Sequence, residues 1–438
     1  MSKKLSKYHN NPNLIAPFFI RIEHSRNGCS EANETVYEIL KTILPSLIDD
    51  TIVASDLRIT SIEGGLSNHL LLLTVPSISH NENDGSLLVD QSKQLLIRIQ
   101  ASTHDSNDGT NMRYSEPDIA CHLADNGIGP QCYGRFLNGR IEEFYPNMRT
   151  LNCREILSPV FNQEIAKHMA RFHLTDFPHK IDDVSDNNFP HKIDDVSDNN
   201  NHDSELKGEI WGRVDGWIQK AVSYSSQRSR KVDPHLTRDI SVQWKWIQSS
   251  FRTRFKGIQK LKQDRKYHFH WKNRAKEYCS ELVFAHMDLQ SLNILTPSKN
   301  DAECDSPTIR LIDFEYSGWN SRAVDIANTF CECCDMNNLK AIYESQYPSS
   351  DNQKLFLQHY IRTCDEKLAK ELDDCESWES FLIAMISEVG KYSVISHISW
   401  AAWSLVQAVE SSIDFDYIMY AKIRLEGYWF SKRKFWEI

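Results

Sequence analysis

Short runs that alternate apolar and polar residues occupy the first third of the chain, and apolar residues at helical spacing dominate the rest. Val36, Ile39, Leu40 and Ile43 share one helical face and predict a helix over 31–47 that stops near Pro45. The same reading predicts strands at 57–63, 69–75 and 94–99, a helix at 116–125, a hairpin from 131–136 and 140–145, and a helix at 158–174. Residues 76–93 are interpreted as a polar insertion. Strands followed by helices favour two lobes in a chain of 438 residues.

Two apolar runs near the middle of the chain each end in an Asp. Leu282–Ala285 leads to Asp288 in the sequence His-x-Asp-x-x-x-x-Asn, which ends at Asn293, and Ile309–Ile312 leads to Asp313. Kinases use this arrangement to hold a hydroxyl nucleophile and Mg²⁺ around a phosphoryl group in transfer. Asp288 is therefore predicted to orient and deprotonate a hydroxyl, and the oxygens of Asn293 and Asp313 to bind Mg²⁺. Ordinary turn residues are the alternative, which the second Asp makes less favourable.

The residues after Asp313 carry a longer signature. Ile312 begins I-D-F-E-Y, Asn320 begins N-x-R, and D-I-x-N-x-F-x-E runs from Asp325 to Glu332. This stretch resembles the choline/ethanolamine kinase family. The resemblance implies a two-lobed, protein-kinase-like α+β fold, with a small antiparallel β-sheet lobe in residues 1–146 and a larger, mainly helical lobe in 147–438. It also implies ATP and Mg²⁺ as cofactors and a small amino alcohol as phosphoryl acceptor.

The resemblance assigns a set of residues to the nucleotide. A turn between two predicted strands could bring backbone N–H groups close to phosphates, although a plain hairpin loop is the alternative. Arg98 stands where protein kinases have a phosphate-pairing Lys. Glu116 is expected to form an ion pair with Arg98. The alternative is that Arg98 is exposed on its strand and that Glu116 is an ordinary acid in the first turn of a helix. The turn is Gly64-Gly65-Leu66-Ser67-Asn68, and the hinge residues Glu143 and Phe144 and the loop residue Gln290 complete the predicted nucleotide site.

A predicted helix at 391–409 has two different faces. Aliphatic residues, among them Val394, Ile398 and Leu405, share one face, and Trp400 and Trp403 fall on the other. Periodicity alone favours core packing for the two indoles. The resemblance favours a cation site, because W-x-x-W-S-x-V-Q followed by S-S-I-x-F-x-Y-x-x-Y is the family's choline-pocket region. It assigns Trp400, Trp403, Phe415 and Tyr420 to the ammonium group, with Glu315 and Glu332 adding negative potential.

The predicted function is a choline kinase that makes phosphocholine from choline and ATP, the first step of phosphatidylcholine synthesis. Asn337 stands where choline-selective members usually carry a Tyr, so ethanolamine kinase is an alternative. A small-molecule phosphotransferase of the aminoglycoside type shares the His-x-Asp-x-x-x-x-Asn motif and is a second alternative. A silent binding protein is disfavoured because the residues of the catalytic motif are intact.

Composition limits the remaining classes. The net charge of −10 argues against a nucleic-acid binder, and 11 scattered cysteines predict a reducing, cytoplasmic environment rather than a disulfide scaffold. Cys331, Cys333 and Cys334 are interpreted as buried thiols of a helix rather than metal ligands. The sequence predicts neither a signal peptide nor a transmembrane segment, because no apolar run approaches about 20 residues. A homodimer is an expectation from the family.

Two further segments stand out. Residues 177–188 are repeated without change as residues 189–200, and their Asp, Asn and Ser content predicts a flexible surface loop. Residues 245–276 hold eleven Lys or Arg and a single acid, with aromatic residues between them. Contact with a membrane surface is one interpretation, and a helix that buries its aromatics and exposes its charges is the other.

Overall fold

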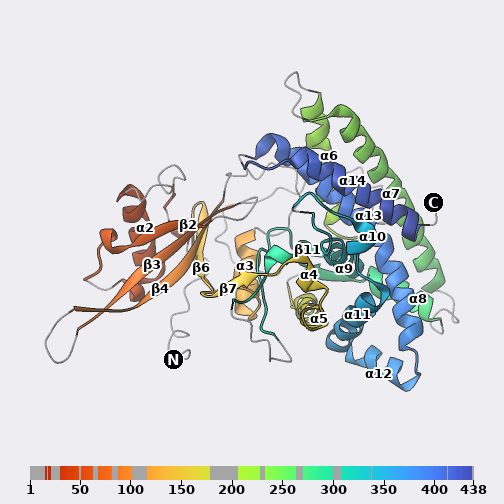
Figure 1. Ribbon diagram of the computed structural model, residues 1–438, viewed down its shortest axis with the longest axis horizontal. Helices are drawn as coiled ribbons and strands as arrows, with labels where there is room; N and C mark the ends of the chain where they lie inside the picture. Colours follow the sequence, from red (N-terminus) through yellow and green to blue (C-terminus); the bar gives the residue numbers. More distant parts are fainter. Residues whose placement is uncertain are drawn as a thin grey trace, which may run out of the picture. The chain divides into compact units, whose positions relative to one another are not determined.

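The computed structural model divides the chain into two compact units, the first ending at Met148 and the second comprising Arg149–Ile438 with Asp108–Tyr114 (Figure 1). The structure describes residues 15–16, 18–20, 30–48, 51–62, 68–80, 87–100, 116–177, 206–226, 232–262, 270–298, 307–336, 338–411 and 413–436.

The first unit is built on a six-stranded sheet with the strand order β1-β5-β6-β4-β3-β2. All neighbouring strands are antiparallel except β1 and β5. Alternate residues of β3 and β4, such as Leu73 and Ile97, are buried against helix α2, whose Leu40 is also fully buried. The strands are β1 (Ile15–Ala16), β2 (Arg58–Ile62), β3 (Asn68–His80), β4 (Leu87–Gln100), β5 (Cys132–Phe136) and β6 (Gly139–Glu143), and α2 spans Ser30–Ile43.

Two sequence predictions in this unit have different outcomes. Helix α3 (Glu116–Asp125) begins and ends at the predicted residues. The interpretation of 76–93 as a polar insertion is wrong at both ends, because β3 continues to His80 and β4 starts at Leu87, with a register shift between Val75 and Ser77. Cross-strand pairing stabilises these polar residues as strands, although their sequence lacks a clear alternation.

The second unit is mainly helical and contains two small antiparallel ribbons, which confirms the predicted fold class. Strand β8 (Leu282–Ala285) pairs with β11 (Gly318–Ser321), and β10 (Arg310–Leu311) pairs with β9 (Ile294–Pro297), which also neighbours β7 (Met148–Thr150). The helices are α4 (Cys153–Ile156), α5 (Pro159–His173), α6 (Ile210–Ser225), α7 (Pro234–Lys262), α8 (Trp271–Ser280), α9 (Arg322–Cys331), α10 (Tyr343–Gln346), α11 (Ser350–Cys364), α12 (Glu366–Asp374), α13 (Trp378–Glu410) and α14 (Tyr417–Phe435).

Helix α13 is the centre of the second unit. It is longer than the predicted 391–409 and packs against α14, α9, α8, α6 and α7, so every residue from Tyr392 to Val406 is buried. Among the described residues it is the one helix with the length and composition to cross a membrane, and 72% of that apolar window is buried inside the protein. Its apolar character on all sides is that of a core helix.

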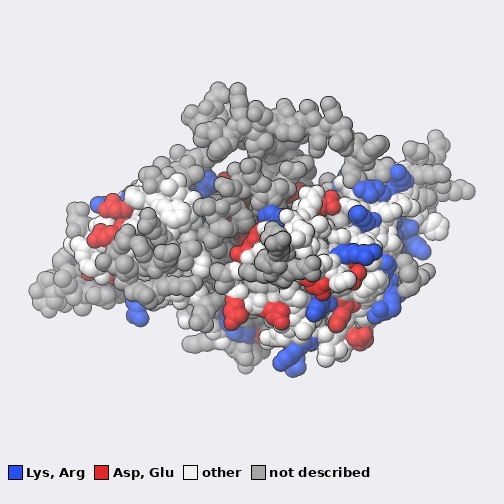
Figure 2. Space-filling model, turned by 90° about the horizontal axis from the view of Figure 1, so that it is seen from above, with Lys and Arg blue, Asp and Glu red and all other residues white. Residues whose placement is uncertain are grey.

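The basic segment behaves as a pair of surface helices in its described parts, which end at Lys262 and resume at His270. Trp244 and Phe251 of α7 are buried, and Trp246 packs beneath the Lys432 ammonium at 3.6 Å, while Lys245 and Lys256 are exposed. Charged side chains of both signs lie on the surface (Figure 2). The structure therefore favours aromatic burial with exposed charge for this segment.

The repeated segment lies outside the described residues from Pro178 onward, so its predicted flexibility stays a prediction. Its first residue, Phe177, is buried and stacks on Phe284 of β8 with ring centroids 3.9 Å apart. The predicted burial of the three neighbouring thiols is confirmed for Cys331, Cys333 and Cys334.

Candidate active site

Asp325 at the start of α9 fixes the loop that follows β8. Its carboxylate accepts hydrogen bonds from the backbone N–H groups of His286 and Met287, both at 2.8 Å, and from His173 Nε2 at 2.9 Å. These bonds lower the pKa of the Asp325 carboxyl although burial opposes the shift. Met287 has φ 68°, a conformation that a residue with a long side chain rarely adopts, and the two amide bonds hold it there. The motif residue Asp325 thus shapes the turn that presents Asp288.

His286 connects the two loops that carry the candidate catalytic acids. Its Nε2 lies 3.2 Å from the Ile312 carbonyl oxygen, and its Nδ1 accepts from the Asp288 N–H at 3.3 Å. Burial lowers the pKa of this imidazole, so the ring is neutral and donates from Nε2 to Ile312. Asp313 follows with φ 66°, which Asp tolerates better than most residues. His286 therefore sets the spacing of Asp288 and Asp313.

Asn293 is oriented by Asp288. Its Nδ2 donates to the Asp288 carbonyl oxygen at 2.8 Å and to the Asp288 carboxylate at 2.9 Å. Because the amide nitrogen is committed to these bonds, Oδ1 remains for another partner. One amide oxygen and the Asp313 carboxylate are hard donors of the kind that suit Mg²⁺, which usually completes its shell with water and phosphate oxygens. The residues present fit the predicted metal.

Asp288 lies in a strongly anionic surrounding. Burial raises the pKa of its carboxyl well above the usual range, and the charges of Glu332, Asp313 and Glu315 raise it further. A hydrogen bond from the Gln290 side chain acts in the opposite direction. Gln290, which the sequence assigned to the nucleotide, therefore contacts the candidate base. A cation brought close to Asp288 would relieve the repulsion among these carboxylates.

An aromatic cluster borders the same acid. Trp400 and Trp403 of α13 meet edge to face with ring centroids 5.5 Å apart, and Trp403 lies 6.4 Å from Tyr420, which lies 5.7 Å from Phe415. The structure thus brings the four predicted aromatics together. It adds Tyr316, whose ring lies 5.0 Å from Trp400 and which the sequence analysis missed. Burial raises the pKa of both Tyr316 and Tyr420, and the charge of Asp288 acts in the same direction. Met287, the residue before Asp288, lines one pocket with Tyr316 and Trp400.

Arg424 is the second residue that the sequence analysis missed. It is fully buried on α14, forms an ion pair with Glu332, and donates to the Tyr420 hydroxyl at 2.7 Å. Its guanidinium lies 5.0 Å from the Tyr420 ring centroid and 6.0 Å from that of Trp400. The carboxylate of Glu332, predicted to add negative potential near an ammonium, is therefore also paired with a cation of the chain itself, and its role toward a ligand stays a prediction. The sequence feature that could have identified Arg424 is its position four residues after Tyr420, which puts both side chains on the same face of a helix.

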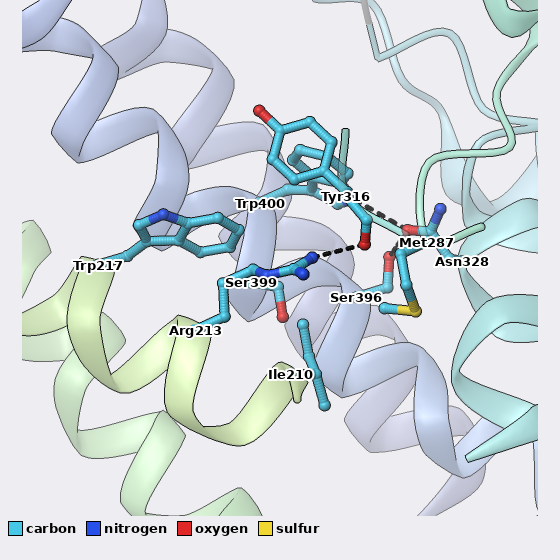
Figure 3. Close-up of a pocket in the computed structure, with 9 residues that line it drawn as sticks. All are labelled: Ile210, Arg213, Trp217, Met287, Tyr316, Asn328, Ser396, Ser399 and Trp400. Carbon is cyan, nitrogen blue, oxygen red and sulfur yellow. Dashed lines mark hydrogen bonds between the residues drawn. The ribbon is translucent and has the colours of Figure 1, made fainter. Parts of the chain in front are cut away.

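A small pocket opens next to the cluster (Figure 3). Arg213 of α6 donates to the Tyr316 carbonyl oxygen at 2.6 Å, and Asn328 of α9 accepts from Trp400 Nε1 at 2.8 Å. The hydrogen bond from Trp400 to Asn328 fixes the plane of the Trp400 indole, which gives the Asn of the D-I-x-N motif a specific contact. The residues that line the pocket are Ile210, Arg213, Trp217, Met287, Tyr316, Asn328, Ser396, Ser399 and Trp400.

The predicted nucleotide residues of the first unit form an ion network that differs from the expected pair. Glu116 binds Arg140 at 2.8 Å, and Glu142 binds Arg140 at 2.7 Å and Arg98 at 3.5 Å. The salt bridge expected between Arg98 and Glu116 is thus replaced by pairing of Glu116 with Arg140, while the charge of Arg98 still helps to lower the Glu116 pKa. The sequence predicted an ion pair for Glu116, but strand β6 supplies a different arginine as its partner.

The structure describes only some of the other predicted nucleotide residues. Gly64, Gly65, Leu66 and Ser67 lie outside the described residues, and Asn68 begins β3. Glu143 accepts from the Gln131 N–H at 3.2 Å, and Phe144 is half-buried. Asn337, on which substrate choice was predicted to depend, also lies outside the described residues.

The family model described as choline/ethanolamine kinase matches residues 59–429. The chain belongs to the choline/ethanolamine kinase family. It is therefore a kinase, a phosphotransferase, and the family implies an amino alcohol as its substrate class. The prediction of the family from residues 312–332 and 400–420 is confirmed.

Relatives and solved structures agree with this assignment. A mouse choline/ethanolamine kinase is 27% identical, over 86% of this chain and 81% of the relative, and a mouse choline kinase alpha is 28% identical, over 86% and 76%. A Drosophila melanogaster ethanolamine kinase is 26% identical, over 81% of this chain and 57% of the relative. In fold, the chain is similar to a choline kinase from Cryptosporidium parvum, with a TM-score of 0.60 and 24% identity; the match covers 92% of this chain and 96% of that one.

Proposed function

We propose that this protein transfers the γ-phosphoryl group of ATP to the hydroxyl of choline and so makes phosphocholine, the first step of phosphatidylcholine synthesis. The observation that carries the proposal is the cluster of Tyr316, Trp400, Trp403 and Tyr420, which borders a pocket that is also lined by Met287, the residue before Asp288. A quaternary ammonium cannot donate a hydrogen bond, so aromatic faces are its best partners in a protein. Ethanolamine kinase is the runner-up, since relatives of both specificities match the chain.

In this proposal Asp288 orients the hydroxyl of the bound amino alcohol and accepts its proton as the phosphoryl group is transferred. His286 and Asp325 hold the loop in place, and aromatic faces hold the ammonium so that the hydroxyl end is presented to Asp288. Asn293 and Asp313 would hold Mg²⁺, which neutralises charge on the phosphate oxygens when bound. The residues assigned to the nucleotide, Arg98 among them, stay a proposal that the family resemblance supports.

Steady-state rates with choline and with ethanolamine at saturating ATP test the substrate. We expect a higher kcat/KM for choline, because a trimethylammonium gains more from an aromatic site than a primary ammonium, which keeps its own hydrogen-bonding needs. A clear preference for ethanolamine would assign the runner-up function. Absence of turnover with both, alongside turnover of an aminoglycoside, would assign the second alternative.

The role of Asp288 is tested with Asp288→Asn. This change keeps the shape of the side chain and removes the base, and we expect kcat to fall by about 10²–10⁴-fold. Burial and three neighbouring carboxylates disfavour the charged form of Asp288 in the folded protein, so its replacement by a neutral amide should not lower the melting temperature. Single-turnover kinetics and thermal melts on the same preparation measure both effects. A variant that keeps most of its kcat would exclude Asp288 as the base.

The cytoplasm is the proposed location, supported by the nine cysteines among the described residues, which are all free. A homodimer is proposed from the family resemblance, and sedimentation of the purified chain would measure it.

A further inference from the structure

Two thiols face each other in the first unit, next to the ion network of Glu116, Arg140 and Glu142. The sulfur atoms of Cys121 on α3 and Cys132 on β5 lie 2.7 Å apart, and both side chains are partly buried. A covalent S–S bond is roughly 2.05 Å long, so the two sulfur atoms need only a small approach to bond. Helix α3 and strand β5 are already joined beside them by the Asp118–Arg135 ion pair at 2.6 Å.

The surroundings favour reaction at Cys121. The hydrogen bond with Cys132 lowers the pKa of the Cys121 thiol, and the positive charges of Arg135 and Arg140 act in the same direction against the cost of burial. The hydrogen bond raises the pKa of the Cys132 thiol. A thiolate at Cys121 with a thiol at Cys132 is the pairing expected of an attacking and a resolving cysteine.

We propose that Cys121 and Cys132 form a reversible modification site, at which a low-molecular-weight disulfide such as oxidised glutathione converts the two thiols to an intramolecular disulfide. The Cys121 thiolate attacks one sulfur of the oxidant, forms a mixed disulfide and releases one reduced glutathione. Cys132 then loses its proton and attacks the Cys121 sulfur, which forms the protein disulfide and releases the second glutathione. Two protein thiols are oxidised and one disulfide is reduced, so the exchange balances.

The bond would fix α3 against the sheet next to the ion network of the first unit. Helix α3 starts at Glu116, whose carboxylate holds Arg140, and Arg140 also holds Glu142. Loss of α3 from the sheet would leave a buried arginine with one partner fewer, which is costly. Closing the loop between Cys121 and Cys132 reduces the freedom of the unfolded chain and so protects this arrangement against thermal opening. The inference does not depend on which amino alcohol is the substrate.

The experiment treats the full-length reduced protein with oxidised glutathione and maps disulfides by mass spectrometry of unreduced peptides. We expect one major cross-link, between the peptides that contain Cys121 and Cys132, and its loss on addition of dithiothreitol. Cys132→Ser should instead keep glutathione on Cys121, because the resolving thiol is gone. Cys375→Ser, which removes an exposed cysteine elsewhere, should leave the cross-link unchanged.

Thermal inactivation gives a second measurement. The oxidised wild-type protein should keep its kinase activity several-fold longer on heating than the reduced protein, and the Cys121→Ser/Cys132→Ser double variant should show no such difference. Cross-links that map only to other cysteines, or glutathione bound only at exposed sites such as Cys375, would overturn the proposal. Because the peptide map uses the wild-type chain, it decides the question even if a variant folds poorly.

Discussion

Trp403 is buried in the protein and belongs to the aromatic cluster proposed to bind the ammonium, and the two roles can be measured separately. Only 5% of its surface is exposed, and its ring meets those of Trp400, Tyr417 and Tyr420. We expect Trp403→Ala to raise the KM for choline by tens of fold with little change in the KM for ATP. A desolvated cation–π contact is worth about 2 kcal/mol, which is the basis of this magnitude.

The matched control is Trp244→Ala, which removes a buried indole of α7 that hydrogen-bonds Asp215. It should lower the melting temperature, as core truncations of this size cost about 3–5 kcal/mol, and leave both KM values unchanged in the folded fraction. If Trp403→Ala behaves in the same way as this control, the aromatic cluster is core alone and does not bind the ammonium.

The Arg424–Glu332 pair gives a second prediction at this scale. Both side chains are almost completely buried, so removing one partner leaves an uncompensated charge. Arg424→Met should lower the free energy of unfolding by about 3–5 kcal/mol, and adding Glu332→Gln should recover a large part of that loss. Urea unfolding of the wild type, both single variants and the double variant measures the coupling. Additive losses in the double variant would contradict a direct pairing.

At the scale of elements, α13 carries a buried histidine that makes stability depend on pH. Neither ring nitrogen of His397 has a hydrogen-bond partner, and its ring packs against Tyr343. Burial, followed by the positive charge of Arg424, lowers the pKa of His397 well below its usual range. The folded protein keeps this ring neutral, whereas the unfolded chain takes up a proton below pH about 6.5. The stability that His397 contributes is therefore present above that pH and lost as the pH falls.

The corresponding variant is His397→Leu, which replaces the titratable ring by an apolar side chain. It should reduce the pH dependence of the unfolding free energy below pH about 6.5 by up to about 1.4 kcal/mol per pH unit. His235→Leu, at an exposed position on α7, is the control that should keep the wild-type slope. Urea titrations at a series of pH values measure the pH dependence of the unfolding free energy. If this dependence is the same in His397→Leu as in the wild type, the folded protein also protonates this ring.

At the scale of the whole molecule, deletion of one copy of the repeated segment tests whether the fold depends on the length of this loop. Because the two copies are identical, deletion of residues 189–200 yields the same sequence as deletion of residues 177–188. The remaining copy still begins with the buried Phe177. Polar insertions in surface loops add little to the free energy of folding, because the cost of loop closure grows slowly with length. We expect unchanged kcat and a melting temperature within experimental error. A large loss of either would show that the second copy has a structural role.

The sequence by itself determined several elements and the chemical class of this protein. Local rules were sufficient where the information is local: the ends of α3, the β5–β6 hairpin, and the acids at the ends of β8 and β10 follow from short patterns of apolar and polar residues. The motif between Ile312 and Glu332 was long enough to identify the family, because each of its polar residues serves a specific contact. In the structure, Asp325 accepts a hydrogen bond from the backbone of the loop that carries Asp288, and Asn328 accepts one from Trp400.

Only the tertiary structure decided which charges pair and which faces are buried. Arg140 replaced Arg98 as the partner of Glu116, and Arg424 neutralised Glu332, because strands and helices far apart in the chain bring these groups together. Helical periodicity separated an aliphatic from an indole face on α13, yet both faces are buried because helices surround it. Periodicity describes one element, whereas ion pairing and burial depend on every element around it, and the free energy of a buried charge is set by those neighbours.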